Sequence, residues 1–209
     1  MLVLPASAQN LSPSTQNLLA QTPEEILAEA NRVLERGRVE EGLSLTMEMK
    51  VPILGRVEMR QYSKGQKSRM VARNRGKEST VWTDGKTMWV YDASENEIVI
   101  IDVEDAGQQG NDKMKLMDGL SKGYDPTLES ETEEAWFLRC IRRKDNHDKN
   151  APKRIDLSVC KGSYLIREVS ISVMGLKVVM KDFALGVDEK DVTFDPLQFP
   201  EAEVIDNRK

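Results

Sequence analysis

Histidine and cysteine are scarce in this sequence, and the carboxylates show no spacing that would bring an acid–base pair together. The single histidine, His147, lies in a polar stretch at 145–148, which favours a solvated turn residue over a catalytic base. Glu133 and Glu134 are sequence neighbours, so a strand would point them to opposite faces. No phosphate-binding loop, H-E-x-x-H, C-x-x-C or G-x-S-x-G pattern occurs. These observations argue against a nucleotide- or metal-dependent enzyme, and we expect no catalytic residue, no cofactor and no metal.

The two cysteines have chemistry of their own. Cys140 and Cys160 lie on consecutive predicted strands, about symmetrically around the connection between them. That spacing could place them opposite each other as a cross-strand disulfide, but a register slip of one residue would send them to opposite faces. Two buried free thiols are the alternative, and the spacing alone leaves both open.

Basic side chains gather in two places. The first cluster consists of Lys64, Lys67, Arg69, Arg73, Arg75 and Lys77. The second consists of Arg139, Arg142, Arg143, Lys144, Lys153 and Arg154. They are either solvent-facing strand residues that discourage edge pairing or a docking face for an acidic partner or anionic lipid headgroups.

Methionine is unusually common, at ten residues against four phenylalanines. Several methionines fall on predicted apolar strand faces: Met47, Met49, Met59, Met70 and Met88. Methionine is flexible and polarisable, so it suits surfaces that accept varied apolar shapes. Ordinary core filling is one interpretation, and the wall of a lipid-accepting cavity is the other.

The stretch at 83–92 predicts a hairpin that carries two of the three tryptophans on or beside it. Asp84-Gly85 is typical of a two-residue type I′ turn between strand-forming residues. After the turn, Trp89 and Tyr91 share one face and Met88 shares the other with Val90. Because both faces are apolar, we expect this hairpin in the middle of a sheet that is covered on each side.

The elements around this hairpin predict a mainly β fold. Thr22-Pro23 begins an amphipathic helix, and Met114, Met117 and Leu120 mark a second, mid-chain helix. The predicted strands are 43–50, 56–63, 67–74, 80–83, 87–91, 96–103, 135–144, 154–160, 163–173, 176–185 and a terminal 202–205. We expect an open (incomplete) antiparallel β-barrel of about 9–11 strands, with both helices covering the concave apolar face.

Composition and the N-terminal residues set the class. The 209 residues carry a net charge of −5, which gives no electrostatic case for nucleic-acid binding. Residues 1–8 end in Ala6-Ser7-Ala8, an A-x-A pattern, so we expect a signal-peptide remnant there; an apolar tail is the alternative. We expect a flexible leader at 9–21, rich in Ser, Asn and Gln, and a single domain at 22–209.

Two segments resemble one known family. Residues 83–92, Thr-Asp-Gly-Lys-Thr-Met-Trp-Val-Tyr-Asp, resemble the Ser/Thr-Asp-Gly-Lys-Thr-Leu-Trp-x-Tyr segment of the periplasmic outer-membrane lipoprotein carrier proteins (LolA-like). Residues 191–209, with Val-Thr-Phe-Asp-Pro and then Val-Ile-Asp, resemble that family's C-terminal segment. The order of elements agrees over about residues 22–209. The sequence therefore resembles a divergent member of this family.

The resemblance implies a monomeric periplasmic carrier that shields lipoprotein acyl chains between the inner and outer membranes. It implies an inner-membrane release complex and an outer-membrane acceptor as partners. The candidate cavity wall is Leu45, Met47, Met59, Met70, Trp82, Met88 and Trp89, and the candidate lid is Met114, Met117 and Leu120. One departure stands out: the family's Arg-Pro pair that tethers the lid is absent, with Arg69 the nearest arginine.

Two other functions compete with the carrier. A sensor or interaction module of the same fold would bind other lipids or a partner protein through the basic faces. A hydrolase with a dispersed site would need an acid–base pair inside the cavity, and no spacing here suggests one.

Overall fold

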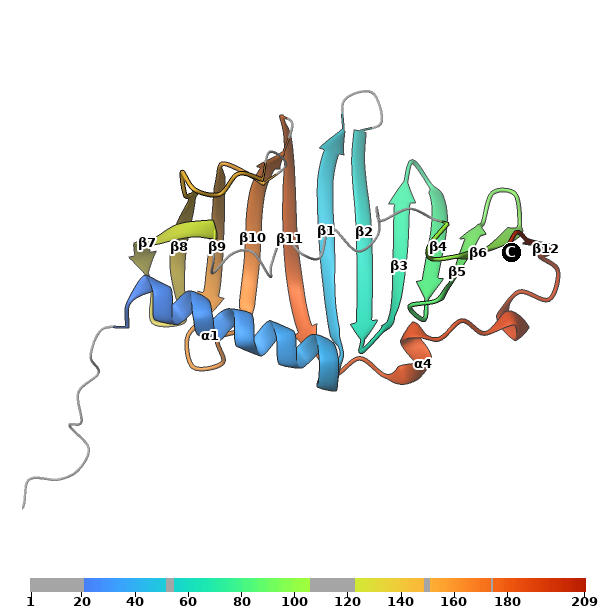
Figure 1. The fold of residues 1–209 in the computed structure, drawn as a ribbon, viewed down its shortest axis with the longest axis horizontal. Helices are drawn as coiled ribbons and strands as arrows, with labels where there is room; N and C mark the ends of the chain where they lie inside the picture. The colour runs from blue at the N-terminus through green and yellow to red at the C-terminus, as the bar shows by residue number, and fades with distance from the viewer. Residues whose placement is uncertain (1–20, 52–54, 106–122, 149–150, 174) are drawn as a thin grey trace, which may run out of the picture.

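A single twelve-stranded sheet forms the body of the protein (Figure 1). The computed structural model describes residues 21–51, 55–105, 123–148, 151–173 and 175–209. The strands lie in the order β12-β6-β5-β4-β3-β2-β1-β11-β10-β9-β8-β7. The two edges, β12 and β7, do not pair with each other, so the sheet fits an open barrel. The expected fold class is confirmed.

The first half of the chain forms six adjacent strands of the sheet, and the second half forms five adjacent strands next to them. The first six strands are β1 (Leu43–Val51), β2 (Gly55–Lys64), β3 (Lys67–Asn74), β4 (Lys77–Thr83), β5 (Thr87–Asp92) and β6 (Glu97–Asp102). The next five are β7 (Tyr124–Glu131), β8 (Ala135–Arg142), β9 (Arg154–Cys160), β10 (Ile166–Val173) and β11 (Leu176–Leu185). The halves join where β1 pairs with β11, and β12 (Glu203–Asp206) adds to β6 as the one parallel pair among the described strands.

The predicted strand count of nine to eleven was too low, because β7 was missed. This strand begins with Tyr124 and Pro126 and continues through polar residues, of which those from Thr127 onward are exposed. A mostly polar edge strand that contains proline and one β-branched residue lacks the alternation of a typical strand. Its pairing with β8 therefore has no clear signal in its own sequence.

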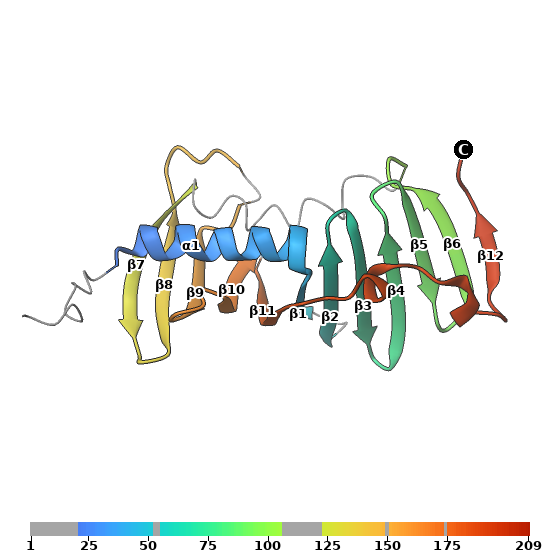
Figure 2. The same ribbon diagram turned by 90° about the horizontal axis from the view of Figure 1, so that it is seen from below.

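Helix α1 (Pro23–Arg36) lies across β7 to β11 (Figures 1 and 2). Its start is the predicted capping box: the Thr22 hydroxyl accepts the Glu25 N–H at 3.2 Å, and the Glu25 carboxylate accepts the Thr22 N–H at 2.9 Å. Gly37 follows the helix and stays in a right-handed helical conformation at φ −56°. The helix continues into a π-helical turn, η2 (Gly37–Glu41), and it is Gly42 that has a positive φ of 84°.

The β4–β5 hairpin is confirmed, but its turn differs from the prediction. Of Asp84 and Gly85, Gly85 alone has a positive φ, at 91°. Three residues, 84–86, connect the strands, and the Asp84 carboxylate accepts the N–H groups of Lys86 at 2.9 Å and Thr87 at 2.8 Å. These hydrogen bonds hold the pKa of Asp84 below its usual value, with Thr87 the larger cause. The aspartate side chain therefore closes the turn in place of a tight type I′ backbone.

The main core lies between α1 and the sheet, and it centres on β8 to β11. Its buried members are Ile26, Leu27, Ala30, Leu34, Leu43, Tyr124, Leu138, Cys140, Ile155, Leu157, Val159, Ile166, Val169, Ile171, Met180 and Phe183. Each large apolar side chain buried here stabilises the fold by about 1.5–3 kcal/mol. The core therefore fixes α1 over the second half of the sheet, away from β3 to β6.

Several expectations fall on residues outside the described part. These are the signal-peptide remnant, nearly all of the leader, and the lid residues Met114, Met117 and Leu120. Among the helices that are described, none is both long and apolar enough to cross a membrane.

Candidate functional site

The two faces of the sheet are best distinguished by α1. We call the face that contacts α1 the helix face and the other the opposite face. Directly paired residues of neighbouring strands point to the same side, so the register assigns each side chain to a face. Met47 pairs with both Met180 of the core and Met59, which places these methionines on the helix face.

Five of the seven candidate cavity residues share the helix face. Leu45 lies two residues from Met47 on β1, and its partner Gln61 pairs with Met70. Met70 in turn pairs with Val81. Thr83 lies two residues after Val81 on the same face of β4, and it pairs with Met88. The structure therefore brings together Leu45, Met47, Met59, Met70 and Met88.

An apolar surface crosses this face beyond the end of α1. On β1 to β3 it consists of Met47, Met59 and Ala72, which are directly paired. From Met70, two residues before Ala72 on β3, it continues across β4, β5 and β6 as the directly paired Val81, Val90 and Val99. These side chains are half-buried, and Met70 is 37% exposed. Adjacent strands are about 4.8 Å apart, so the surface spans roughly 24 Å from β1 to β6. We call it the methionine surface.

Trp82 and Trp89 do not belong to the methionine surface. They pair with each other, and Trp82 also pairs with Arg69, which places all three on the opposite face. The structure does not bring them together with the other five candidates, because Trp82 and Trp89 each lie one residue away from Val81 and Met88 along their strands. A shift of one residue moves a strand side chain to the other face.

The chain that follows β11 runs across β3 to β6 (Figure 2), and its contacts with Lys67, Trp82 and Trp89 place it on the opposite face. This C-terminal segment contains α4 (Glu189–Val192) and a 3₁₀ turn, η3 (Pro196–Gln198), before β12. Lys67 Nζ on β3 contacts Glu189 Oε1 at 2.5 Å, and Lys64 Nζ donates to the Val187 carbonyl at 3.1 Å. Polar contacts from the first basic cluster thus anchor the start of the segment.

Aromatic rings fix the rest of the segment. Phe194 stacks on Trp89 at 5.2 Å between ring centroids and meets Trp82 edge-on at 5.4 Å. Phe199 meets Trp82 at 5.6 Å and Tyr91 at 4.4 Å. Such pairs contribute about 0.5–1.5 kcal/mol each beyond burial. The sequence resemblance had singled out this tail without giving its phenylalanines a role; two of only four phenylalanines within six residues were the available signal.

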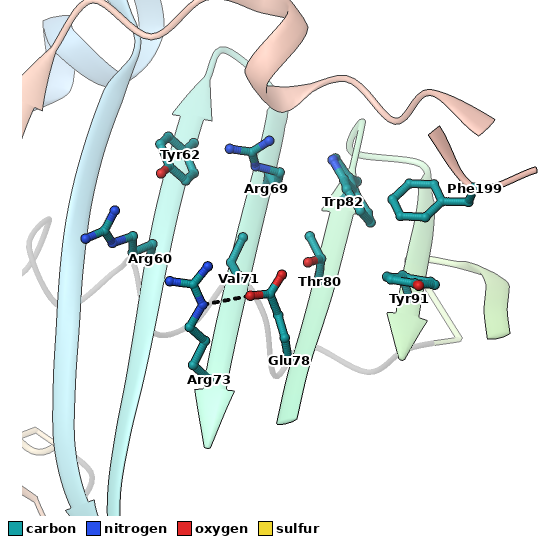
Figure 3. A pocket seen from close by; sticks show the side chains of 10 residues that line it. All are labelled: Arg60, Tyr62, Arg69, Val71, Arg73, Glu78, Thr80, Trp82, Tyr91 and Phe199. Carbon is teal, nitrogen blue, oxygen red and sulfur yellow. Dashed lines mark hydrogen bonds and ion pairs between the residues drawn. The ribbon is translucent and has the colours of Figure 1, made fainter. Parts of the chain in front are cut away.

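A groove of about 310 Å³ opens on the opposite face beside this aromatic cluster (Figure 3). Its lining combines arginines and aromatic rings: Arg60, Tyr62, Arg69, Val71, Arg73, Glu78, Thr80, Trp82, Tyr91 and Phe199. Sequence reasoning placed Arg69 and Arg73 in a basic cluster but did not connect them with Phe199, which is far away along the chain. We call this site the arginine groove.

The three arginines of the groove have different partners. Arg73 Nε contacts Glu78 Oε2 at 2.7 Å, and Arg60 Nε lies 3.8 Å from Glu58 Oε1. The guanidinium of Arg69 lies over the Tyr62 ring, 4.4 Å from its centroid. Its Nε is buried and has no hydrogen-bond partner among the described residues.

Elsewhere on the opposite face, charges are paired at the seam between the halves. Glu48 accepts from Lys181 at 2.8 Å and from Arg56 at 2.5 Å. The hydrogen bonds from Lys181 and then Arg56 hold the pKa of Glu48 below its usual value. This pairing joins β1, β2 and β11, so it stabilises the junction.

The expected alternative of a disulfide is not found. Cys140 pairs with Ile155 and Cys160 with Ala135, so the cysteines lie five residues apart along adjacent strands. At about 3.4 Å per residue that is roughly 17 Å, far beyond the ~7 Å limit between Cα atoms. Both thiols are free, and burial raises the pKa of Cys140 to about 12.

The remaining candidates for chemistry are dispersed. His147 is exposed in the connection after β8. Within the described ranges, no three His, Cys, Asp or Glu side chains come together as metal ligands would. In the second basic cluster, Arg139 is paired with Glu129 and Asp156, and Arg154 is paired with Asp156. These two arginines fit solvent-facing strand residues with local partners.

No protein-family model matches the sequence, and no curated protein matches it. Solved structures do resemble it. An uncharacterized conserved protein from Thermus thermophilus is 15% identical with a TM-score of 0.50, over 88% of this chain and 98% of that one. The LolA superfamily protein NE2245 from Nitrosomonas europaea is 16% identical with a TM-score of 0.33, over 84% and 99%. MucB, from the Pseudomonas aeruginosa MucA/MucB complex, is 13% identical with a TM-score of 0.47, over 86% and 63%.

The likeness to the Thermus thermophilus protein, at a TM-score of 0.50, shows a shared fold. At these identities the likeness covers the fold alone. Evidence for a ligand therefore comes from the methionine surface and the arginine groove.

Proposed function

We propose that this protein is a non-enzymatic carrier of the cell envelope, located in the periplasm, that binds lipoprotein acyl chains on the methionine surface. The observation that carries the proposal is the run of paired apolar side chains from Met47 to Val99 beyond the end of α1. The sequence resemblance to the lipoprotein carriers supports the cargo class and the two membrane partners.

The physical requirements of such a carrier agree with the surface. Each buried methylene stabilises a lipid–protein contact by about 0.8 kcal/mol, so a long apolar track suffices and no catalytic group is needed. Flexible methionines adapt to chains of different length and unsaturation. Release then requires an acceptor that offers the acyl chains a still better apolar site.

Site-specific photo-cross-linking tests the proposal directly. A photoreactive phenylalanine analogue would replace Met70 on the methionine surface or, as the matched control, Phe137. Met70 is 37% exposed and Phe137 39%, and Phe137 lies on the opposite face because it pairs with Ser158, one residue from Leu157 of the core. The two probes thus differ in face and hardly in accessibility.

After irradiation of intact cells, we expect lipoprotein adducts at position 70 and none at position 137. Native mass spectrometry of the protein purified from the envelope should also show bound lipid or lipoprotein. Equal labelling at both positions, or a protein that is always empty and forms no lipoprotein adduct, would contradict the carrier. Protein adducts without acyl chains would instead favour the interaction module.

A further inference from the structure

Among the described residues, no carboxylate is paired with Arg69 in the arginine groove. Arg73 is paired with Glu78 at 2.7 Å, and Arg60 lies near Glu58 at 3.8 Å. Arg69 instead lies over a neutral ring and keeps a buried Nε without a partner in the described part of the chain. A buried donor that makes no hydrogen bond destabilises a protein. A ligand that supplies an acceptor to Arg69 would remove this cost.

The geometry around Arg69 restricts the ligand's charge. Tyr62 and Trp82 are its direct cross-strand neighbours on β2 and β4, and Figure 3 shows its guanidinium between their side chains. Beside Arg69, which has no ion-pair partner in the described ranges, Arg73 and Glu78 form an internal ion pair. A monoanion therefore balances the site, and a planar carboxylate matches the fork of N–H donors on a guanidinium.

The aromatic wall restricts the rest of the ligand. Trp82, Tyr91 and Phe199 line the same groove, and the last of these comes from the C-terminal segment. Their rings offer a rigid apolar contact area at little cost in side-chain entropy. The volume, about 310 Å³, is at the lower end for small-molecule sites, which corresponds to a ligand about the size of one amino acid.

We infer that the arginine groove binds a small monocarboxylate attached to an apolar group. Arg69 receives the carboxylate, while Trp82 and Phe199 contact the apolar part. This site is on the opposite face from the methionine surface, so it is independent of the proposed carrier function. Its ligand could be a free organic acid or the C-terminal residue of a peptide, since both present the same chemistry.

Calorimetric titration with 4-phenylbutyrate tests the assignment. We expect a Kd of about 0.1–1 mM, the range for a ligand of about twelve non-hydrogen atoms. 4-Phenylbutyramide, which has the same shape and no charge, should bind at least about tenfold more weakly, as should phenylbutyrate to Arg69→Gln. Arg69→Lys should weaken binding less, because it keeps the charge and loses the planar fork.

Arg56→Gln is the matched control. Arg56 lies on the same face of β2 as Arg60, but it pairs with Glu48 and does not line the groove. The control should bind phenylbutyrate with wild-type affinity, and thermal unfolding should show that Arg69→Gln remains folded. If that variant does not fold, the comparison of the acid with its amide on wild-type protein decides the question.

Two further probes identify the source of the carboxylate. Acetyl-glycyl-phenylalanine and its C-terminal amide present the peptide form of the same chemistry. Binding of either free acid with loss in its amide supports the assignment, and the tighter of the two names the source. Absence of binding by both acids, equal binding of acid and amide, or tighter binding of phenyl phosphate would overturn it. None of these outcomes bears on lipoprotein cross-linking at Met70.

Discussion

Removal of one ring from the C-terminal segment tests whether aromatic packing fixes it to the opposite face. Phe194 contacts three rings: Trp89 at 5.2 Å, Trp82 at 5.4 Å and Phe199 at 6.2 Å between centroids. Phe194→Ala removes all three contacts and most of the buried area of a core phenylalanine, since the side chain is largely buried. The same segment offers a matched control in Leu197, which is 85% exposed.

The magnitude follows from these contacts. Replacing a fully buried phenylalanine by alanine costs about 3–5 kcal/mol, so this largely buried one costs roughly 2–4 kcal/mol. That figure already contains the ring–ring energy of about 0.5–1.5 kcal/mol per pair, so the total stays at about 2–4 kcal/mol. Leu197→Ala removes little buried area, so its effect should stay within about 0.5 kcal/mol.

Urea denaturation followed by circular dichroism measures the free energy of unfolding of both variants. Tryptophan emission adds a local readout, because Trp82 and Trp89 would become more exposed in Phe194→Ala and shift to longer wavelength. Equal stability losses for the two substitutions, or a loss below about 0.5 kcal/mol with unchanged emission for Phe194→Ala, would refute the packing described for this segment.

Three other perturbations follow from the structure. Gly42→Ala should lower the free energy of unfolding by about 3 kcal/mol and Gly162→Ala by about 1 kcal/mol: both have φ near 84°, but a Cβ on Gly42 would lie 2.6 Å from another side chain and one on Gly162 would meet nothing within 4 Å. At pH 8 a thiol reagent should modify Cys160 and spare the buried Cys140, whose pKa is raised to about 12, until urea is added; intact mass should not change with reductant. Glu48→Gln should be less stable than wild type at pH 7. The difference should begin to shrink below the usual carboxyl pKa of 4.5 and be lost as the pH falls through the lowered pKa of Glu48, because the fold is stabilised only while the carboxylate is ionised; equal stability at pH 7 would contradict the pairing at the seam.

The sequence predicts best the features that depend on residues close together in the chain. The capping box at Thr22 depends on residues within one helical turn, and the alternation around Met47 depends on residues within one strand. Both are therefore visible in the sequence itself. The hairpin at 83–92 and the open antiparallel sheet follow from the same kind of signal. The turn at Asp84 was missed in detail because a side chain, and not the backbone alone, closes it.

The candidate site was harder because faces and distant partners are set by register. Alternation separated Met88 from Trp89 correctly, but it could not say which face α1 would cover. Nor could local pattern bring Phe199 to Trp82 or separate Cys140 from Cys160, since these depend on how strands and the tail align across the sheet. The parallel pairing of β12 with β6, from distant parts of the chain, is of the same kind.

The joining of β1 to β11 has a consequence for synthesis. Met47 pairs with Met180, so the seam closes only after nearly the whole chain has left the ribosome. Helix α1 is translated first, yet the strands that bury Ile26 and Leu27 come in the second half. Such distant pairings slow folding, and they leave an apolar helix without its partners meanwhile. We expect a nascent chain that stops before β9 to depend on holding chaperones or to be degraded, because α1 lacks the strands that bury its apolar side chains.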